Sequence, residues 1–284
     1  MFNCFSVAGQ SVDYNKLIFK HLSSEDGLSQ RSVTDVLQDK NGYLWFGTRD
    51  GLNKYDGDKI TIYRHKSNDF NGLTNSWVTS IYQDHNSNLW IGTKDGLNRY
   101  IPEKDNFVQY KQDSASNSLT DNSIWSISHV NDSVVGVATN NGLNLIDLKN
   151  FEISLFNVES KTNKSLIEDN RFRHILTTKK GDVWLCSVEL ISVFNSENNL
   201  ITEIDYPTDL RSEIHLNISP TLFEDAQANI WLGYEKGLAV FNKTTKKFET
   251  FKIDDKKIIN SGVRTICQDN HGNIWIVLMT DCMF

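Results

Sequence analysis

The chain has 284 residues, of which 39% are hydrophobic, and its formal net charge is −7. This length and hydrophobic content allow one large β domain or two smaller ones with a substantial core, and they exclude a disordered tail. Because the acidic balance removes the attraction that supplies most non-specific nucleic-acid affinity, we expect no nucleic-acid partner.

The first ten residues contain a short apolar stretch that ends in Ser6-Val7-Ala8. This small-x-small spacing is typical of a signal-peptidase site, although the basic region and the full-length apolar region of a signal peptide are missing. Residues 1–10 are therefore either a signal-peptide remnant, which implies a periplasmic or other extracytoplasmic location, or a disordered terminus. No run approaches the roughly 18 apolar residues of a membrane-spanning helix, so we expect no membrane insertion by this segment.

The rest of the chain repeats with a period of about 45 residues. Starting from Trp45, the equivalent positions follow at spacings of 45, 46, 48, 47 and 44 residues and are Trp90, Gly136, Trp184, Trp231 and Trp275. Each unit reads as four short β-runs separated by turns, which is the size of a propeller blade. We therefore predict an all-β protein, an incomplete β-propeller of four-stranded blades with five full blades and half of a sixth.

In this interpretation the partial propeller covers residues 17–284. The blades are expected at about residues 33–65, 77–111, 124–157, 172–205, 216–252 and 262–278. One indole recurs in the second strand of five units, as Trp45, Trp90, Trp184, Trp231 and Trp275. Because a blade can bury its apolar faces only against neighbouring blades, we interpret these indoles as structural wedges between blades.

Two kinds of turn recur in the units. The turn Asp39-Lys40-Asn41-Gly42 begins with Asp and ends with Gly, the preference of a type I turn followed by a left-handed residue. A second turn closes on Gly-Leu and, like the first, is typical of a hairpin connector. Because Ser87 and Ala228 replace the first glycine in two units, and Leu190 replaces the second in one, we expect those turns to be distorted or differently closed.

The repeated pattern also carries a family resemblance. The stretches DKNGYLWFGTRDGLNKY and DHNSNLWIGTKDGLNRY resemble the two-component regulator propeller repeat, which occurs in the extracytoplasmic sensor region of Bacteroidetes-type hybrid two-component histidine kinases. The stretch FKHLSSEDGLSQRSV resembles the start of such a region. The resemblance covers residues 17 to about 276.

The resemblance implies a sensor of oligosaccharides or related solutes whose parent carries seven-bladed propellers, a membrane helix and kinase modules. It implies that residues 17–22 form an outer strand that closes the ring. It also implies contacts with the remaining sensor blades and kinase modules, and a homodimer. The pattern fails at Ile276-Val277-Leu278, so we expect a fragment or truncated product without the kinase.

Ligand contacts are expected where the repeats differ, on loops at one face around the central channel. Strand entries supply Arg31, Trp77, Trp125, Arg171, Arg173, His215 and Arg264, and the turns after the Trp strands supply Arg49, Lys94, Asn140 and Glu235. Trp77 and Trp125 lie outside the wedge position, where an exposed indole can stack on a sugar ring. The alternative for Trp77 and Trp125 is that they fill a gap between blades. The alternative for the arginines and His215 is that they belong to the ordinary solvated surface.

The sequence contains no recognisable catalytic constellation. It lacks G-x-S-x-G, H-E-x-x-H and a glycine-rich phosphate loop, and its repeated Asp residues are explained as turn caps. The four cysteines, Cys4, Cys186, Cys267 and Cys282, have no metal-ligand spacing and are interpreted as buried hydrophobes or tail residues. We therefore predict a ligand-sensing module that is not an enzyme and has no cofactor or metal. The alternatives are a propeller enzyme of the carbon–oxygen lyase type, which needs a metal or a His/Glu cluster at the channel mouth, and a protein-interaction scaffold.

Overall fold

The regular elements of the protein are all β-strands in the part of the chain that the computed structural model describes. That part comprises residues 6–7, 22–114, 117–156, 171–187, 190–195, 200–206, 220–235, 237–253, 256–257, 262–269 and 271–278. No helix that could span a membrane occurs within these ranges. The chain divides into two compact units, of which unit 1 combines Met1–Ile18 with Arg173–Phe284 and unit 2 is Phe19–Phe172.

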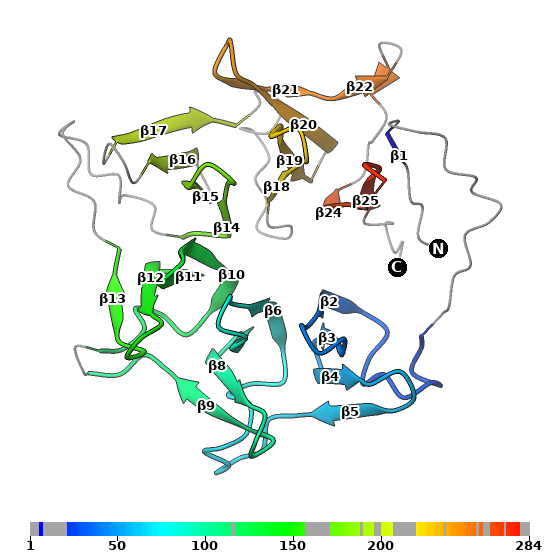
Figure 1. Ribbon diagram of the computed structural model, residues 1–284, viewed down its shortest axis with the longest axis vertical. Coiled ribbons are helices and arrows are strands. Elements are labelled where there is room, and N and C mark those ends of the chain that lie inside the picture. The colour runs from blue at the N-terminus through cyan, green and yellow to red at the C-terminus, as the bar shows by residue number, and fades with distance from the viewer. Residues whose placement is uncertain are drawn as a thin grey trace. The chain divides into compact units, whose positions relative to one another are not determined.

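Unit 2 contains three antiparallel four-stranded sheets, here called blades 1 to 3. Blade 1 has β2 (Val33–Gln38), β3 (Leu44–Thr48), β4 (Gly51–Tyr55) and β5 (Ile60–Tyr63). Blade 2 has β6 (Val78–Gln83), β7 (Leu89–Thr93), β8 (Gly96–Ile101) and β9 (Asn106–Tyr110). Blade 3 has β10 (Ile124–Asn131), β11 (Val134–Thr139), β12 (Gly142–Asp147) and β13 (Ile153–Leu155). The first strands β2, β6 and β10 lie next to one another, and β5, β9 and β13 form the outer edges (Figure 1).

Unit 1 contains two more four-stranded sheets of the same order. Blade 4 has β14 (His174–Thr177), β15 (Asp182–Cys186), β16 (Leu190–Asn195) and β17 (Leu200–Asp205). Blade 5 has β18 (Thr221–Glu224), β19 (Ile230–Tyr234), β20 (Gly237–Asn242) and β21 (Lys247–Thr250). A short hairpin follows, made of β22 (Lys252–Ile253) and β23 (Lys256–Lys257). Sheets of four antiparallel strands in chain order are the blades of a β-propeller, as the period of the sequence predicts.

A further sheet of unit 1, here called the sixth sheet because it follows the five blades, combines strands from near both ends of the chain. It contains β24 (Val263–Gln268) and β25 (Ile274–Leu278), and β1 (Ser6–Val7) pairs antiparallel with β25 through Ser6 opposite Trp275 and Val7 opposite Ile274. Residues of the N-terminal stretch thus occupy the third-strand position of this sheet. The expected closing strand at residues 17–22 lies outside the described residues, apart from Leu22.

Each wedge indole of unit 2 packs against the following blade. Trp45 is 1% exposed, and its ring centroid lies 5.1 Å from that of Tyr100 in blade 2. Trp90 is fully buried in a cluster that includes Val135 and Ile146 of blade 3. The blades of unit 2 are therefore joined by apolar contact between large side chains, which supplies most of the stability of such repeats.

Unit 1 uses its wedge indoles in the same way. Trp184 makes an edge contact with Phe241 of blade 5, with ring centroids 5.0 Å apart. Trp231 packs in one cluster with Val263 and Ile276 of the sixth sheet. Trp275, in that last sheet, is half-buried.

The indole nitrogens are held by the aspartates of the preceding turns. Four wedge indoles donate their Nε1–H to an Asp Oδ2 at 2.8 to 2.9 Å, in the pairs Trp45–Asp39, Trp90–Asp84, Trp231–Asp225 and Trp275–Asp269. The same carboxylates accept backbone N–H groups of their own turns. Burial alone raises the pKa of the Asp225 carboxyl, but hydrogen bonds from Trp231 and Asn229 outweigh it and hold that pKa below its usual range.

The expectation that Ser87 and Ala228 distort their turns is wrong. Both residues adopt the left-handed conformation of glycine, with φ of 71° and 60°. Their N–H groups donate to Asp84 and Asp225 carbonyl oxygens, as Gly42 does to Asp39. The aspartate side chain fixes the turn through its bonds to the backbone and the indole, so the turn forms even where a side chain strains it. The turn at Leu190 is closed by hydrogen bonds to Ser187 instead of by a glycine.

Candidate functional site

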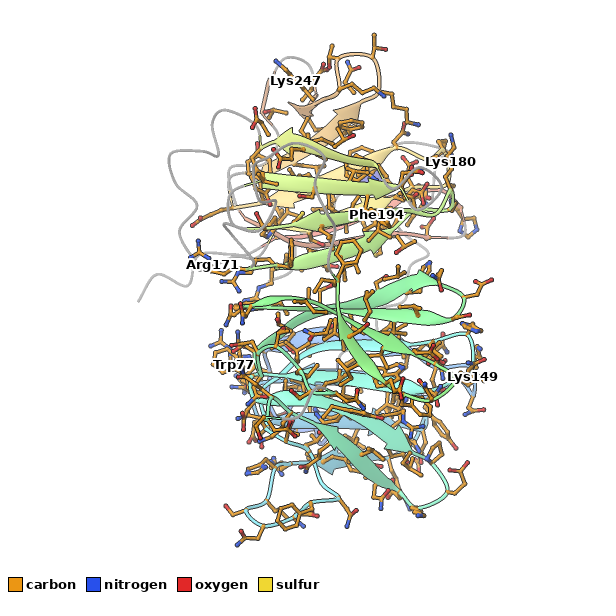
Figure 2. All side chains as sticks on the ribbon, turned by 90° about the vertical axis from the view of Figure 1, so that its left-hand side faces the viewer. Trp77, Lys149, Arg171, Lys180, Phe194 and Lys247 are labelled. Atoms are coloured by element: carbon orange, nitrogen blue, oxygen red, sulfur yellow. The ribbon has the colours of Figure 1, made fainter. Side chains whose placement is uncertain are left out.

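Five of the candidate residues lie together at one edge of unit 2. These residues form a chain of successive side-chain contacts, which we call the indole row: Arg49, Trp77, Lys94, Trp125 and Asn140. Its members come from all three blades of the unit. Figure 2 shows Trp77 at one edge of the unit and Lys149, in the turn before β13, at the opposite edge.

The first half of the row places two cations at one indole. The Arg49 guanidinium carbon lies 4.7 Å from the centroid of the Trp77 ring, and Lys94 Nζ lies 5.6 Å from the same centroid. Trp77 is 37% exposed, so its indole is accessible from solvent. Both distances are in the range of a cation–π interaction, which is stronger for tryptophan than for other aromatic residues.

The second half of the row centres on Trp125. Lys94 Nζ lies 3.2 Å from the centroid of the Trp125 ring, and the Trp125 Nε1–H donates to Asn140 Oδ1 at 2.9 Å. Lys94 therefore bridges the two indoles, and Asn140 fixes the orientation of the second. The ring and the ammonium are both only partly buried.

Backbone hydrogen bonds hold the loops that carry the row. Gly51 N–H donates to Ser76 O, and Gly96 N–H donates to Asn122 O, so the turn of one blade is tied to the strand entry of the next. Lys94 N–H donates to Trp77 O at 3.1 Å within blade 2. The row thus rests on loops whose backbone is fixed by the scaffold.

A buried polar triad below each of these loops adds to their rigidity. In blade 2, Thr74 N–H donates to Asn98 Oδ1 at 2.9 Å, and the Thr74 and Thr93 hydroxyls are hydrogen-bonded at 2.9 Å. Asn98 Nδ2 also donates to Thr74 Oγ1 at 3.0 Å. The same three bonds recur as Ser29–Thr48–Asn53 in blade 1 and Thr120–Thr139–Asn144 in blade 3. The signal for this triad is present in the sequence of unit 2 as Gly-Leu-Asn after each second turn, where the glycine alone is explained by the turn.

Trp125 owes its direction to a β-bulge that sequence reasoning missed. The pairing of β10 with β11 skips one residue between Ile124 and Ser126, and Trp125 is that residue. The same irregularity places Arg264 between Val263 and Thr265 in β24. A bulge redirects a side chain out of the alternation of the strand, and bulges occur often next to binding sites.

The carboxylates next to the row cations are held by other basic residues. Asp50 accepts from Arg64 at 2.9 Å, and Asp95 accepts from Lys111 at 2.6 Å. Arg64 and Lys111 follow the outer strands β5 and β9. Both ion pairs are half-exposed. In each pair the carboxylate of the turn binds a basic residue that follows the outer strand of the same blade.

The described contacts do not include the other candidates in the row. Arg31 is exposed ahead of β2, and Arg171 is exposed in the last described segment of unit 2. In unit 1, Arg173 N–H donates to Cys186 O at 2.8 Å, Glu235 is half-buried after β19, and Arg264 is exposed on β24. His215 lies outside the described residues.

The described ranges of the chain contain no group of three or more His, Cys, Asp or Glu side chains that could hold a metal ion. Its chemistry at the row is that of two indoles, an ammonium, a guanidinium and an amide. Such groups are suited to stacking, cation–π contact and hydrogen bonding.

The sheets, together with the similar solved structures, define the protein as a β-propeller. The chain aligns with the extracellular domain of a hybrid two-component system of B. thetaiotaomicron at a TM-score of 0.71 and 23% identity, over 91% of this chain and 40% of that one. It aligns with virginiamycin B lyase of Staphylococcus aureus at a TM-score of 0.61 and 14% identity, over 89% of this chain and 83% of the lyase. At these identities the likenesses show the fold.

Three segments of the chain resemble a known repeat, the two-component regulator propeller repeat. The sequence model of that description matches residues 27–50, 72–95 and 257–278. A histidine kinase of Formosa agariphila, named Histidine kinase P4, is 48% identical over 68 residues, which is 24% of this chain and 5% of the kinase. The chain therefore spans a small part of this relative and less than half of the B. thetaiotaomicron domain.

Proposed function

We propose that this chain is part of the extracytoplasmic ligand-sensing region of a two-component sensor, and that it binds an oligosaccharide or related solute at the indole row. The observation that carries the proposal is the row itself, in which two indoles outside the wedge position share one lysine at an edge of three blades. The family match supports the sensor class, because the matching model describes a two-component regulator propeller, and its first two segments contain Arg49, Trp77 and Lys94.

In this proposal the chain binds without catalysing a reaction. Indoles recognise the apolar face of a sugar ring, and the cations and Asn140 supply polar contacts that fix its orientation. In this proposal the chain lies outside the cytoplasm. Its contacts with further blades, with a second copy and with the kinase modules of the parent protein transmit the effect of ligand binding.

Isothermal titration of the full chain against neutral and acidic oligosaccharides tests the proposal. We expect saturable binding without turnover of the bound sugar. Trp77→Ala and Trp125→Ala abolish the binding in this proposal, because the first removes the exposed stacking surface and the second removes the ring that holds Lys94 in the row. The matched control is Phe70→Ala, which removes an aromatic ring that is 79% exposed elsewhere in unit 2.

The outcomes separate the possible functions. Normal binding by both Trp variants means that the site lies elsewhere. Cleavage products in the titrated sample support the lyase alternative, and no heat with any saccharide supports a protein-interaction scaffold.

A further inference from the structure

We infer that the ligand of the indole row is anionic, namely an oligosaccharide that carries carboxylate or sulfate groups. The inference rests on the proposed function and specifies its ligand class. It comes from the charges at the row and from their positions on the indoles.

The row contains two cations and no carboxylate. Arg49 is exposed, and Lys94 lies between two indoles in an adjacent blade. A guanidinium matches a carboxylate or a sulfate through parallel N–H donors, and an ammonium adds a compact charge. Two such groups in successive blades suit a ligand with negative charge.

The aspartates beside these cations do not cancel that charge at the row. Asp50 directly follows Arg49 and is paired with Arg64, and Asp95 directly follows Lys94 and is paired with Lys111. Each turn thus contributes a cation to the row and directs its acid towards a basic residue after an outer strand. The arrangement occurs twice, in blades 1 and 2.

The positions of the cations on the rings disfavour a neutral sugar. Lys94 Nζ already lies over the Trp125 ring at 3.2 Å from its centroid. A neutral sugar that stacked on this face would have to displace the ammonium and lose the cation–π contact. An anionic group can approach the ammonium and the guanidinium where they are, while the rest of the sugar packs beside the exposed Trp77 indole.

The charge of the whole chain does not oppose this recognition at close range. The formal net charge is −7, but charges farther away than the Debye length, about 8 Å at physiological salt, are largely screened. The local field of Arg49 and Lys94 then dominates at the row, and the affinity must fall as salt is added.

The test is isothermal titration of the full chain with two probes of equal length, tetragalacturonate and cellotetraose, at 50 and 500 mM NaCl. We expect tetragalacturonate to bind at least about tenfold more tightly than cellotetraose at low salt, and the difference to shrink at high salt. A sulfated tetrasaccharide as a third probe shows whether sulfate replaces carboxylate.

Two variants assign the preference to the row. Arg49→Gln and Lys94→Met keep the approximate length of the side chains, and each is expected to weaken tetragalacturonate binding about tenfold and so to remove most of the preference over cellotetraose. The matched control is Lys149→Met, which removes an exposed lysine at the opposite edge of unit 2 and should leave both affinities unchanged (Figure 2).

Each result decides between the two statements. If cellotetraose binds as tightly as the acidic probes, and Trp77→Ala abolishes its binding, the anionic inference is wrong and the proposed function stands. If the acidic probes bind but Arg49→Gln and Lys94→Met do not weaken them, the charge preference belongs to another site and the inference is wrong. If none of the probes binds, both statements are overturned.

Discussion

At the scale of single residues, one hydrogen bond distinguishes blade 4 from the other Trp-containing blades. Among the described residues the buried Trp184 Nε1 has no hydrogen-bond partner, because Thr178 stands six residues before Trp184 where the other Trp-containing blades have Asp. A buried N–H without a partner costs about 1 to 3 kcal/mol. This missing hydrogen bond allows a direct test of how much the indole–aspartate pair stabilises a blade.

We predict that Thr178→Asp stabilises the protein by about 0.5 to 1.5 kcal/mol, because the new carboxylate accepts the Trp184 Nε1–H. Thr178 Oγ1 already accepts the Asp182 N–H, a bond that the aspartate can keep. The free energy of unfolding from urea titration measures the effect. The reverse change in blade 2, Asp84→Thr, should destabilise by at least as much, and a destabilising Thr178→Asp would contradict the pairing.

A second prediction concerns the strained turns at Ser87 and Ala228. Replacing either residue with Gly relieves a positive φ and should stabilise the protein by about 0.5 to 1 kcal/mol, once the greater freedom of the unfolded chain is included. The matched control is Gly42→Ala, which introduces a side chain at a φ of 87° where no atom lies within 4 Å. That control isolates backbone strain and should lower the thermal midpoint.

The third prediction is a pH dependence at Asp35. This side chain on β2 accepts the Ile81 N–H of blade 2 at 2.6 Å, and burial raises the pKa of its carboxyl to about 6 against the backbone hydrogen bonds from Ile81 and Val36. A folded-state pKa above the unfolded value of about 3.9 means that the folded protein binds the proton more tightly. The penalty for the charged form is therefore absent below about pH 4 and complete above about pH 6.

Asp35→Asn removes this titration. The difference in unfolding free energy, variant minus wild type, should rise by on the order of 1 kcal/mol between pH 4 and pH 7.5. Urea titrations at several pH values measure it. A difference that stays flat over this range means that the carboxyl titrates normally.

At the scale of elements, neighbouring blades approach each other through a glycine in the second strand. A Cβ built on Gly92 of β7 would lie 2.6 Å from Ile124 Cγ2 of β10, and one on Gly47 would lie 2.8 Å from Val78 Cγ1. The first strand of the next blade therefore packs directly on this backbone. The repeated Gly-Thr of the pattern serves this contact between blades.

We predict that Gly92→Ala destabilises the protein by about 1 to 3 kcal/mol through overpacking. Ile124→Ala is destabilising alone, because Ile124 is fully buried, but it creates the space that the new methyl group needs. The double variant should therefore be more stable than the sum of the two single changes implies. Strict additivity in this double-mutant cycle would mean that the two residues do not collide.

The elements themselves were predictable from the sequence because their signals are local. The turn aspartates, the alternating apolar residues and the period of about 45 residues indicate four strands per unit, and the sheets have that order. The distortion predicted for the turn at Ser87 is wrong. Turn propensity depends on the residues of the turn alone, whereas hydrogen bonds from the Asn88 N–H and the Trp90 Nε1–H to the Asp84 side chain fix this turn.

At the scale of the whole molecule, the sequence could indicate candidate positions for the site but not their grouping. Strand entries and turns yield eleven candidates, and contacts join five of them in unit 2. The bulge recurs at the same place in β2, β6 and β24, so the grouping depends on a tryptophan standing at the bulge of β10 and on the reach of Lys94. The structural role of the wedge indoles was easier to predict, because a large apolar side chain that recurs at a fixed period is nearly always part of the core.

The measurement that tests the central claim most directly is amide hydrogen exchange of the full chain with and without tetragalacturonate. We expect bound sugar to slow exchange in the segments around Arg49, Trp77, Lys94, Trp125 and Asn140, and we expect Trp125→Ala to remove this protection. Protection confined to other loops, or protection that persists in Trp125→Ala, would contradict the central claim.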